Sequence, residues 1–255
     1  MSWDDLQGEG VVAARSEVDT ARFGVVVARV RVGSGTTDEQ AARRVADEME
    51  RIAPTVAVTR WPAERIGLAT EMRRRGLQVQ PADTLVYWAA DADGPATPSA
   101  DGPVRLGTSP DLEAEVLDLV ASVFAGYPTH YLASPVFTPA LVTEGYVDWA
   151  RRTVREDPDA VLVQLVEGHA AALATTARVD AGRATEVLLA GTRRDHRRRG
   201  VYCALLSGVL ATASTEGVER VLISTQASNV AAQRAWCALG LRPVAAWTTV
   251  HLSRA

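Results

Sequence analysis

The sequence predicts an α/β (α+β) protein in which helices flank a sheet. Segments rich in β-branched residues alternate with segments of helical apolar spacing, which is the pattern of strands covered by helices. Three strand-like runs within residues 159–192 follow one another without a helix and indicate an antiparallel meander. The segment DADGPATPSADGP, residues 91–103, lacks apolar periodicity and is expected to be a linker. It divides a smaller domain, residues 1–90, from a larger domain, residues 104–255.

The smaller domain is expected to alternate three strands with two helices. The expected strands are residues 23–32, 55–60 and 84–90, and the expected helices are residues 37–52 and 64–75. Thr37 or Asp38 would cap the first of these helices, because both side chains accept hydrogen bonds from free helix N–H groups.

The larger domain is expected to open with two helices and then to form the meander. Its expected helices are residues 110–126, 145–156, 200–215 and 229–239, and its expected strands are residues 159–167, 170–179, 185–192, 220–225 and 245–252. Two segments that follow helices share one spacing of glycine, threonine and an aromatic ring, which favours the smaller domain as a shortened copy of the larger one. These positions are Gly76, Thr84 and Tyr87 in the first segment and Gly240, Thr248 and His251 in the second.

The composition is that of a globular protein and argues against several functional classes. The 255 residues are 47% hydrophobic and carry a formal net charge of −4, which is unlike a nucleic-acid-binding domain. No apolar run approaches the roughly 20 residues of a membrane helix, and the N-terminus lacks a signal-peptide pattern, so we expect a cytoplasmic protein. Cys203 and Cys237 are expected to be small core residues. Neither the cysteines nor the four histidines have metal-ligand spacing, so no metal is expected.

The segment RRDHRRRG, residues 193–200, gathers positive charge at the start of an expected helix. A helix N-terminus presents free N–H groups and the positive end of the helix dipole, which together bind anions such as phosphate. Gly200 lets the backbone approach such a ligand, and arginine side chains form paired hydrogen bonds with its oxygens. Solvated arginines are the simpler interpretation of an arginine run, but arginine at a helix start opposes the dipole, which favours a bound anion.

Two motifs resemble those of the GCN5-related N-acetyltransferase (GNAT) superfamily. RRRGVY, residues 197–202, resembles the R/Q-x-x-G-x-G/A turn that holds the pyrophosphate of acetyl-CoA, and NVAAQRAWCALGL resembles the N-x-x-A-x-x-x-Y-x-x-x-G-F pattern. The match covers roughly residues 104–255 and implies a central mixed, mostly antiparallel sheet, preceded by a smaller truncated GNAT-like domain. It also implies acetyl-CoA, or another short acyl-CoA, as co-substrate. The implied acyl-CoA-binding residues are Leu189, Ala190, Gly191, Thr192, Arg197, Arg198, Arg199, Gly200, Val201, Tyr202, Asn229, Ala232 and Trp236.

Further segments resemble the sugar-nucleotide amine acetyltransferases of the dTDP-fucosamine type. VDTARFG looks like their D-x-x-x-F-G opening, and STQASN is also similar. FAGYPTHYLASP followed by YVDWARR is similar to their acceptor-side segment, with Phe124 and Pro135 at matching places. The resemblance implies N-acetylation of the amine of an amino sugar, in particular one linked to a nucleotide. The implied acceptor-binding residues are His130, Tyr131, Tyr146, Trp149 and Gln226.

Acyl transfer from a thioester to an amine needs a deprotonated amine, donors for the oxyanion and an acid for the thiolate. The resemblance implies that the strand before the turn splays from its neighbour and offers an N–H near Leu189 to Gly191. His130 is the first candidate for the base, because imidazole titrates near neutral pH, but it equally suits a contact to substrate. Glu186 is next, although a surface carboxylate at a strand end is its simpler interpretation. His251 is a further candidate beside a structural role.

Trp236 departs from the family pattern. Many members have tyrosine there, and its phenol protonates the CoA thiolate, a role that an indole N–H cannot take. Water, the substrate or a hydroxyl such as that of Tyr202 or Tyr131 would replace it, or the domain binds acyl-CoA without turnover. Tyr202 stands where the family has glycine or alanine, and we expect it to contact the ligand.

Other functions stay open beside the amino-sugar enzyme. A tandem GNAT acting on another small-molecule amine, such as an antibiotic or a thiol precursor, would share the scaffold. A non-catalytic acyl-CoA-binding module would explain Trp236. Nucleic-acid binding is disfavoured because no aromatic interleaving accompanies the arginine run. The terminal strand offers an edge for a homodimer, an expectation that rests on family analogy.

Overall fold

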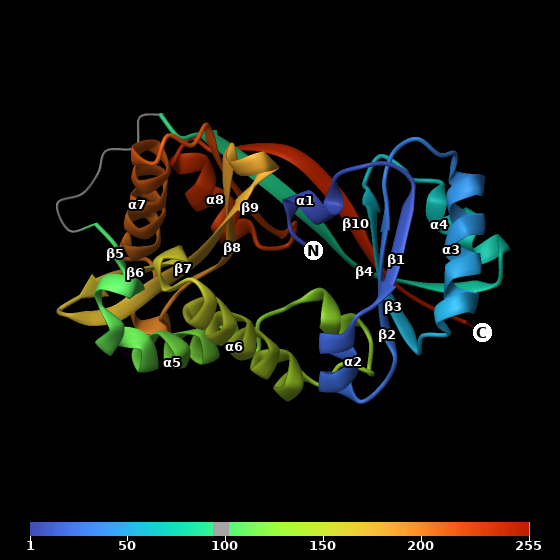
Figure 1. Ribbon diagram of the computed structural model, residues 1–255, viewed down its shortest axis with the longest axis horizontal. Coiled ribbons are helices and arrows are strands. Elements are labelled where there is room, and N and C mark those ends of the chain that lie inside the picture. The colour runs from blue at the N-terminus through green and yellow to red at the C-terminus, as the bar shows by residue number, and fades with distance from the viewer. Residues whose placement is uncertain (94–101, 255) are drawn as a thin grey trace. The chain divides into compact units, whose positions relative to one another are not determined.

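The computed structural model describes residues 1–93 and 102–254, which fall into two compact units (Figure 1). Unit 1 comprises Met1–Val86, Pro128–Val142 and Ala245–Ala255, and unit 2 comprises Tyr87–Tyr127 and Thr143–Val244. The division expected from the sequence is continuous along the chain, whereas these units are not, because residues 128–142 and the last strand pack into unit 1. Residues 94–101 of the expected linker lie outside the described residues.

Unit 1 is a mixed sheet accompanied by helices. Its elements are α1 (Trp3–Leu6), β1 (Val11–Arg15), α2 (Glu17–Phe23), β2 (Val27–Val32), α3 (Asp38–Ile52), β3 (Val56–Pro62), α4 (Leu68–Arg74), most of β4 (Leu77–Asp91), the short 3₁₀ helix η3 (His130–Ala133) and most of β10 (Arg242–Arg254). The strand order is β1-β2-β3-β10-β4. β2 and β3 are parallel, whereas β1 with β2 and β3 with β10 are antiparallel.

In helix α3 of unit 1, side chains pair with the backbone N–H groups at the helix start, and one face of the helix is buried. The Gln40 N–H donates to the Thr37 hydroxyl at 3.2 Å, and the Thr37 N–H donates to the Gln40 side chain at 3.1 Å. This capping box selects Thr37 from the two expected caps. Ala41, Val45 and Met49 recur at helical spacing and are fully buried in the core of unit 1, beside the sheet that α3 covers in Figure 1.

Unit 2 also contains sheet strands, and helices pack on both of their faces. Its remaining elements are β5 (Val104–Arg105), η1 (Leu106–Thr108), η2 (Pro110–Leu112), α5 (Glu113–Phe124), most of α6 (Pro139–Glu156), η4 (Pro158–Ala160), β6 (Val161–Val166), β7 (His169–Val179), η5 (Asp180–Gly182), β8 (Ala184–Thr192), η6 (Arg194–His196), α7 (Val201–Thr215), β9 (Arg220–Gln226) and α8 (Val230–Ala238). The strand order is β4-β9-β8-β7-β6-β5. The expected meander is confirmed, because β6, β7 and β8 pair antiparallel, and β8 then pairs parallel with β9.

The sheet of unit 2 has an apolar core on each face. Leu162 and Ala172 belong to the core that α7 and α8 cover. Val161, Val163 and Leu173 belong to the core that α5 and α6 cover. The alternation follows from the period of two along a strand. Burial of both faces explains why the sequence of these strands is an almost continuous apolar run.

Several elements differ from the expectations. α1, β1 and α2 precede the first expected strand, and β4, α6 and β10 are longer than expected. β1 is an edge strand of mostly exposed residues, so its apolar signal is weak. Cys237 is exposed, contrary to the expectation of a core residue, because one helical step of 100° separates it from the buried Trp236. Within residues 1–93 and 102–254, no helix is long and apolar enough to cross a membrane.

Candidate functional site

Strand β8 carries one extra residue opposite β7. The register pairs Thr175 with Leu189 but Thr176 with Val187, so Leu188 has no opposite residue and forms a β-bulge. Val187 packs in the core under α7 and α8, whereas Leu189 packs in the core under α5 and α6. A regular strand would place these two side chains on one face, so the bulge reverses the alternation at this point.

Beyond the bulge, β8 and β9 stop pairing. Their parallel register ends at Val187 and Ile223, although β8 continues to Thr192 and β9 continues to Gln226. We call the unpaired ends of these two strands, residues 188–192 and 224–226, the strand opening. The splay implied by the family resemblance is therefore present in the structure.

The backbone of β8 directs alternate N–H groups toward the strand opening. The Leu189 N–H donates to Thr175 Oγ1 at 3.2 Å, and the Arg193 N–H donates to the Ala171 carbonyl at 2.9 Å, so both face β7. Because N–H directions alternate along a strand, the N–H of Ala190 faces the opposite edge, where β9 has separated. Within the expected range of Leu189 to Gly191, Ala190 is thus the donor directed into the opening.

The start of α7 lies directly after β8 and has no side-chain cap. Gly200 occupies the N-cap position with φ of 80°, a left-handed conformation that favours glycine. A Cβ at Gly200 would meet no atom within 4 Å, so the backbone here is open. Arg198 also has a positive φ of 62°, which is a strained conformation for arginine. The free N–H groups of the first turn of this 15-residue helix are therefore accessible to a ligand.

The arginines of the turn divide into paired and unpaired side chains. Arg193 forms an ion pair with Asp118 at 2.9 Å, and Arg197 Nε donates to the Thr192 carbonyl at 3.1 Å. Arg198 and Arg199 are exposed, and neither has an ion-pair partner within the described chain. These two guanidinium groups leave a net positive charge at the uncapped helix start.

Buried polar atoms also lack partners beside the turn. Thr192 Oγ1 and His196 Nδ1 are covered and have no hydrogen-bond partner among the described residues. Buried polar groups are nearly always paired in proteins, so such atoms point to a ligand or an ordered water. The open helix start, the two exposed arginines and these atoms together suit a phosphate-bearing ligand.

The hydrogen bonds of Asn229 explain the residue spacing of the second expected motif. Its side-chain oxygen accepts from the Ala232 N–H at 3.3 Å and caps α8, and its amide donates to Thr225 Oγ1 at 3.0 Å. The three-residue spacing from asparagine to alanine is therefore the spacing from an N-cap to the N3 position. Asn229 links the start of α8 to the end of β9.

The buried Trp236 and the half-buried Tyr202 form a pair at the core under α7 and α8. The Trp236 indole N–H donates to the Tyr202 hydroxyl at 3.0 Å, and Trp236 packs edge-on against Trp88 with ring centroids 6.1 Å apart. Burial raises the pKa of Tyr202 far above its ordinary value of 10, although the bond from Trp236 lowers it in part. Tyr202 therefore stays protonated at neutral pH, and its oxygen already accepts from an indole.

Tyr127 is a site residue that the sequence did not reveal. Its hydroxyl donates to the Gln226 side-chain oxygen at 2.5 Å and lies 3.2 Å from Thr225 Oγ1, at the end of β9. Its ring packs edge-on against Phe124, which stacks on Tyr146 with centroids 4.2 Å apart. The order F-x-x-Y at the end of a helix carries no specific signal, so only the fold exposes this contact.

Glu186 is buried, which corrects its simpler interpretation as a surface carboxylate. It is 2% exposed, and the buried Tyr87 hydroxyl donates to its Oε1 at 3.0 Å. It lies two residues before the bulge on β8. Trp149, an expected acceptor contact, packs with Tyr146 against the core under α5 and α6.

The expected residues fall into both units. All expected acyl-CoA-binding residues lie in unit 2, together with Tyr146, Trp149, Glu186 and Gln226. His130, Tyr131 and His251 lie in unit 1, where His130 Nδ1 is 3.4 Å from His251 Nε2. The Tyr131 hydroxyl accepts from Arg29 at 2.9 Å.

Neither histidine titrates near neutral pH, which corrects the reason given for His130 as a base. Burial, with the charge of Arg60, holds the pKa of His130 well below 6.5. The same two causes lower the pKa of His251 to about 4. Both rings are therefore neutral at pH 7 and bind a proton weakly. No group of three metal-ligating side chains is found within the described ranges.

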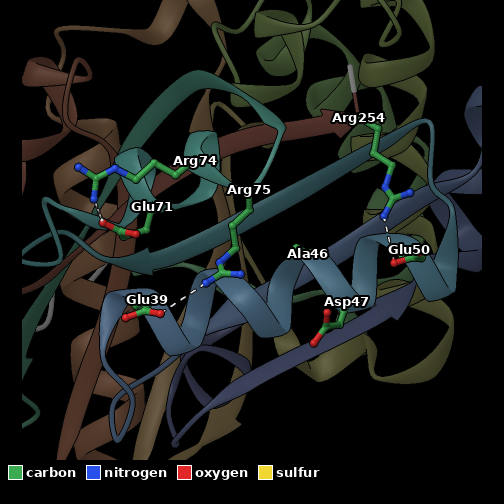
Figure 2. A pocket seen from close by; sticks show the side chains of 8 residues that line it. All are labelled: Glu39, Ala46, Asp47, Glu50, Glu71, Arg74, Arg75 and Arg254. Atoms are coloured by element: carbon green, nitrogen blue, oxygen red, sulfur yellow. Dashed lines mark hydrogen bonds and ion pairs between the residues drawn. The ribbon is translucent and has the colours of Figure 1, made fainter.

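A hollow on unit 1 is lined mostly by charged side chains, several of which form ion pairs with one another (Figure 2). Arg75 pairs with Glu39 at 3.6 Å, and Arg254 pairs with Glu50 at 3.6 Å. Arg74 likewise pairs with Glu71 beside them. These three pairs balance most of the charge in the hollow, and Asp47 is the one lining carboxylate outside them.

The comparisons agree with the geometry of unit 2. Residues 127–241 match the acetyltransferase (GNAT) family. No curated protein matches the chain significantly. A GCN5-related N-acetyltransferase from Sphaerobacter thermophilus has a TM-score of 0.64 and 18% identity, over 95% of this chain and 76% of that chain.

Two other solved structures have related folds. A tandem GNAT protein from the clavulanic acid biosynthesis pathway has a TM-score of 0.56 and 16% identity, over 89% of this chain and 77% of that one. A glucosamine N-acetyltransferase region of a fungal multi-domain β-N-acetylglucosaminidase has a TM-score of 0.56 and 8% identity, over 83% of this chain and 27% of that one. At these identities the likeness concerns the fold. The family match over residues 127–241 covers slightly less than half of the chain and includes the strand opening and the uncapped turn.

Proposed function

We propose that this protein transfers an acetyl group from acetyl-CoA to the amine of an amino sugar, in particular one linked to a nucleotide. The observation that carries the proposal is the strand opening at Ala190 followed directly by the uncapped start of α7. Two supports favour an amino-sugar acceptor. One is the resemblance of the acceptor-side segment to sugar-nucleotide amine acetyltransferases, and the other is the fold shared with a protein described as a glucosamine N-acetyltransferase.

In this proposal the turn holds the pyrophosphate of acetyl-CoA. The N–H groups of Val201 and Tyr202 belong to the uncapped first turn of α7 and would donate to phosphate oxygens. Arg198 and Arg199 would add charge-assisted hydrogen bonds. The rest of the ligand would lie along the strand opening, so that the thioester carbonyl accepts from the Ala190 N–H.

Tyr202 is proposed as the acid that protonates the leaving thiolate. Its hydroxyl oxygen accepts from the Trp236 indole, so its own proton is directed away from Trp236. Among the described residues no acceptor for that proton is found. Burial keeps the phenol protonated by raising the pKa of Tyr202. Trp236 would then orient the acid instead of acting as one.

The amine must lose a proton when it attacks the thioester carbon, and Glu186 is proposed as the acceptor of that proton. The carboxylate lies on β8 in the same unit as the strand opening. Tyr87 holds one of its oxygens at 3.0 Å. The nitrogen–carbon bond forms, the carbon–sulfur bond breaks, and the thiolate takes the proton of Tyr202. His130, Tyr131, Tyr146, Trp149, Gln226 and His251 remain proposed acceptor contacts.

A second candidate function is acetylation of another small-molecule amine. The tandem GNAT protein of the clavulanic acid pathway covers this chain more fully than the glucosamine enzyme region does, which favours this alternative. The alternatives differ only in the acceptor, because both use the strand opening and the turn.

The test is acetyl transfer from acetyl-CoA to UDP-glucosamine and dTDP-linked amino sugars, with the products identified by mass spectrometry. The proposal predicts the gain of one acetyl group by at least one of them and release of free CoA. The N-acetylated sugar nucleotides serve as matched controls and should release no CoA. Acetylation of amines outside the sugars alone would favour the second candidate, and CoA binding without any transfer would contradict both.

A further inference from the structure

A hydrogen-bond network surrounds the end of β9 in unit 2. The Tyr127 hydroxyl donates to Gln226 Oε1 at 2.5 Å and lies 3.2 Å from Thr225 Oγ1. The Thr225 hydroxyl also donates to Gln226 Oε1 at 3.3 Å, and the Asn229 amide donates to Thr225 Oγ1 at 3.0 Å. We call these four residues, which all belong to unit 2, the β9 network. Thr225 and Gln226 lie on the unpaired end of β9 in the strand opening.

Tyr127 reaches the β9 network from a packed aromatic cluster. Its ring packs edge-on against Phe124, with centroids 5.5 Å apart, and against Tyr146, with centroids 6.4 Å apart. Phe124 and Tyr146 stack on each other at 4.2 Å in the core under α5 and α6. Edge-on and stacked contacts favour particular orientations of aromatic rings. The cluster therefore holds the Tyr127 hydroxyl in one position beside β9.

The β9 network sets the orientation of the Gln226 side-chain amide. A separation of 2.5 Å suits an O–H···O bond and is shorter than an N–H···O bond, so the Gln226 oxygen faces Tyr127. That oxygen accepts from two hydroxyls, those of Tyr127 and Thr225. Gln226 Nε2 then faces away from the network, and its two N–H donors have no partner in residues 1–93 or 102–254. An amide held in this way can donate to an oxygen of a ligand.

The β9 network and the start of α7 lie on opposite faces of the sheet strands in unit 2. Tyr127 packs with the core under α5 and α6, whereas Val201 and Tyr202 pack with the core under α7 and α8. In the proposed reaction acyl-CoA occupies the face of α7, because its phosphates lie at the start of that helix. The acceptor must then reach the thioester from the face of α5 and α6. Gln226, which contacts Tyr127, therefore lies on the side from which the acceptor arrives.

We propose that Tyr127 is a positioning residue that aims the Gln226 amide at the acceptor, where the amide donates to an oxygen next to the reacting amine. This inference rests on the proposed function and adds a specificity contact to the same site. In a 2-amino sugar the carbons on either side of the amine carry oxygens, which accept such bonds. The contact therefore favours amino sugars over amines without a neighbouring oxygen.

The test is steady-state acetyl transfer to UDP-glucosamine and dTDP-linked amino sugars by the native protein, Tyr127→Phe, Gln226→Leu and the double variant. Phenylalanine keeps the ring of Tyr127 and removes its hydroxyl. We expect Tyr127→Phe to raise KM for the sugar nucleotide about fivefold, the effect of losing about one hydrogen bond. Gln226→Leu should raise the same KM about tenfold. In both variants kcat and KM for acetyl-CoA should stay nearly unchanged, because only binding of the acceptor is weakened.

The double variant separates positioning from a structural role. If Tyr127 acts through Gln226, the double variant should have the same KM as Gln226→Leu alone. Independent effects would instead multiply, and a structural role would also raise KM for acetyl-CoA. Thr215→Val is the matched control for loss of a hydroxyl in unit 2, because the Thr215 hydroxyl donates to the Ala211 carbonyl at the exposed far end of α7. This control should leave both KM values unchanged.

Two results would overturn the inference while the acyltransferase proposal stands. One is an unchanged KM for the sugar nucleotide in Tyr127→Phe, and the other is multiplied effects in the double variant. A native protein that acetylates none of these sugar nucleotides would overturn the proposed amino-sugar function and this inference with it. Turnover by the native protein therefore distinguishes the two failures.

Discussion

Helices α3 and α7 each have 15 residues, but they begin in opposite ways. The start of α3 in unit 1 is closed by the capping box of Thr37 and Gln40. The start of α7 in unit 2 has Gly200 in place of a capping side chain, beside arginines that oppose the helix dipole. A helix that serves stability satisfies its own N–H groups, whereas one that binds an anion leaves them free. Substitutions at α3 should therefore change stability, and substitutions around α7 should change ligand binding and turnover.

The largest effect is expected at Tyr202. Tyr202→Phe removes the proposed acid and should lower kcat about 100-fold, with KM for acetyl-CoA nearly unchanged. Trp236→Phe removes only the orienting N–H and should lower kcat less. The measurement is steady-state acetyl transfer. Trp61→Phe is the matched control, because Trp61 lies in the core of unit 1 and its loss should leave kcat unchanged.

An activated thioester sharpens this prediction. Phenyl thioacetate releases a thiol that leaves readily as the anion, so its reaction needs no acid. The defect of Tyr202→Phe should shrink with this substrate. An equal defect with both thioesters would show that Tyr202 acts through structure alone.

Unit 1 should respond to acid through its stability. The pKa of His251 is about 4 in the folded protein, whereas an unburied histidine has a pKa of 6.5. As pH falls from about 6.5 to about 4, the unfolded chain binds the proton first, so the free energy of unfolding should decrease by about 3 kcal/mol. Above pH 7 the titration of His251 does not change the free energy of unfolding. Urea unfolding at several pH values measures this slope, which His251→Asn should reduce, and an unchanged slope would contradict the burial of a neutral ring.

The arginines of the turn should act on affinity. Arg198→Ala and Arg199→Ala should each weaken acetyl-CoA binding by about three- to tenfold, corresponding to about 1 kcal/mol, and high salt should reduce the difference. Calorimetry at two ionic strengths measures this. Arg43 is exposed on α3, and Arg43→Ala is a control that should leave the affinity for acetyl-CoA unchanged. An unchanged affinity for acetyl-CoA in both variants would contradict this role and show that the two arginines are solvated side chains.

The smallest effect is expected at the closed helix start. Thr37→Ala should lower the free energy of unfolding by about 1 kcal/mol, because one capping bond is lost. The acetyl-CoA dissociation constant should stay the same. Chemical denaturation and calorimetry on one preparation provide both values. A change in acetyl-CoA affinity with an unchanged free energy of unfolding would contradict the stabilising role of the α3 start.

Features that depend on short-range spacing were predictable from the sequence. The Thr37 cap, the strand meander and the turn around Gly200 each rest on residues within a few positions of one another. The asparagine-to-alanine motif is equally local, because Asn229 caps the helix that contains Ala232. Local hydrogen bonding and strand or helix period fix such features.

Features that depend on contacts between distant segments were not predictable. The bulge at Leu188 leaves no mark in an apolar run that is buried on both faces. The bond between Tyr202 and Trp236 joins residues 34 positions apart. The low pKa of His130 arises from burial and from Arg60, which no spacing reveals.

The central claim is that the open start of α7 binds acetyl-CoA, and calorimetry on Gly200→Glu tests it most directly. Glutamate would place a negative charge and a strained side chain at the phosphate turn. Gly217→Glu is the matched control, because Gly217 also has a positive φ and open surroundings, and it follows the other end of α7. We predict that acetyl-CoA binds the native protein and Gly217→Glu but not Gly200→Glu. Equal binding by all three proteins, or no binding by the native protein, would contradict the account.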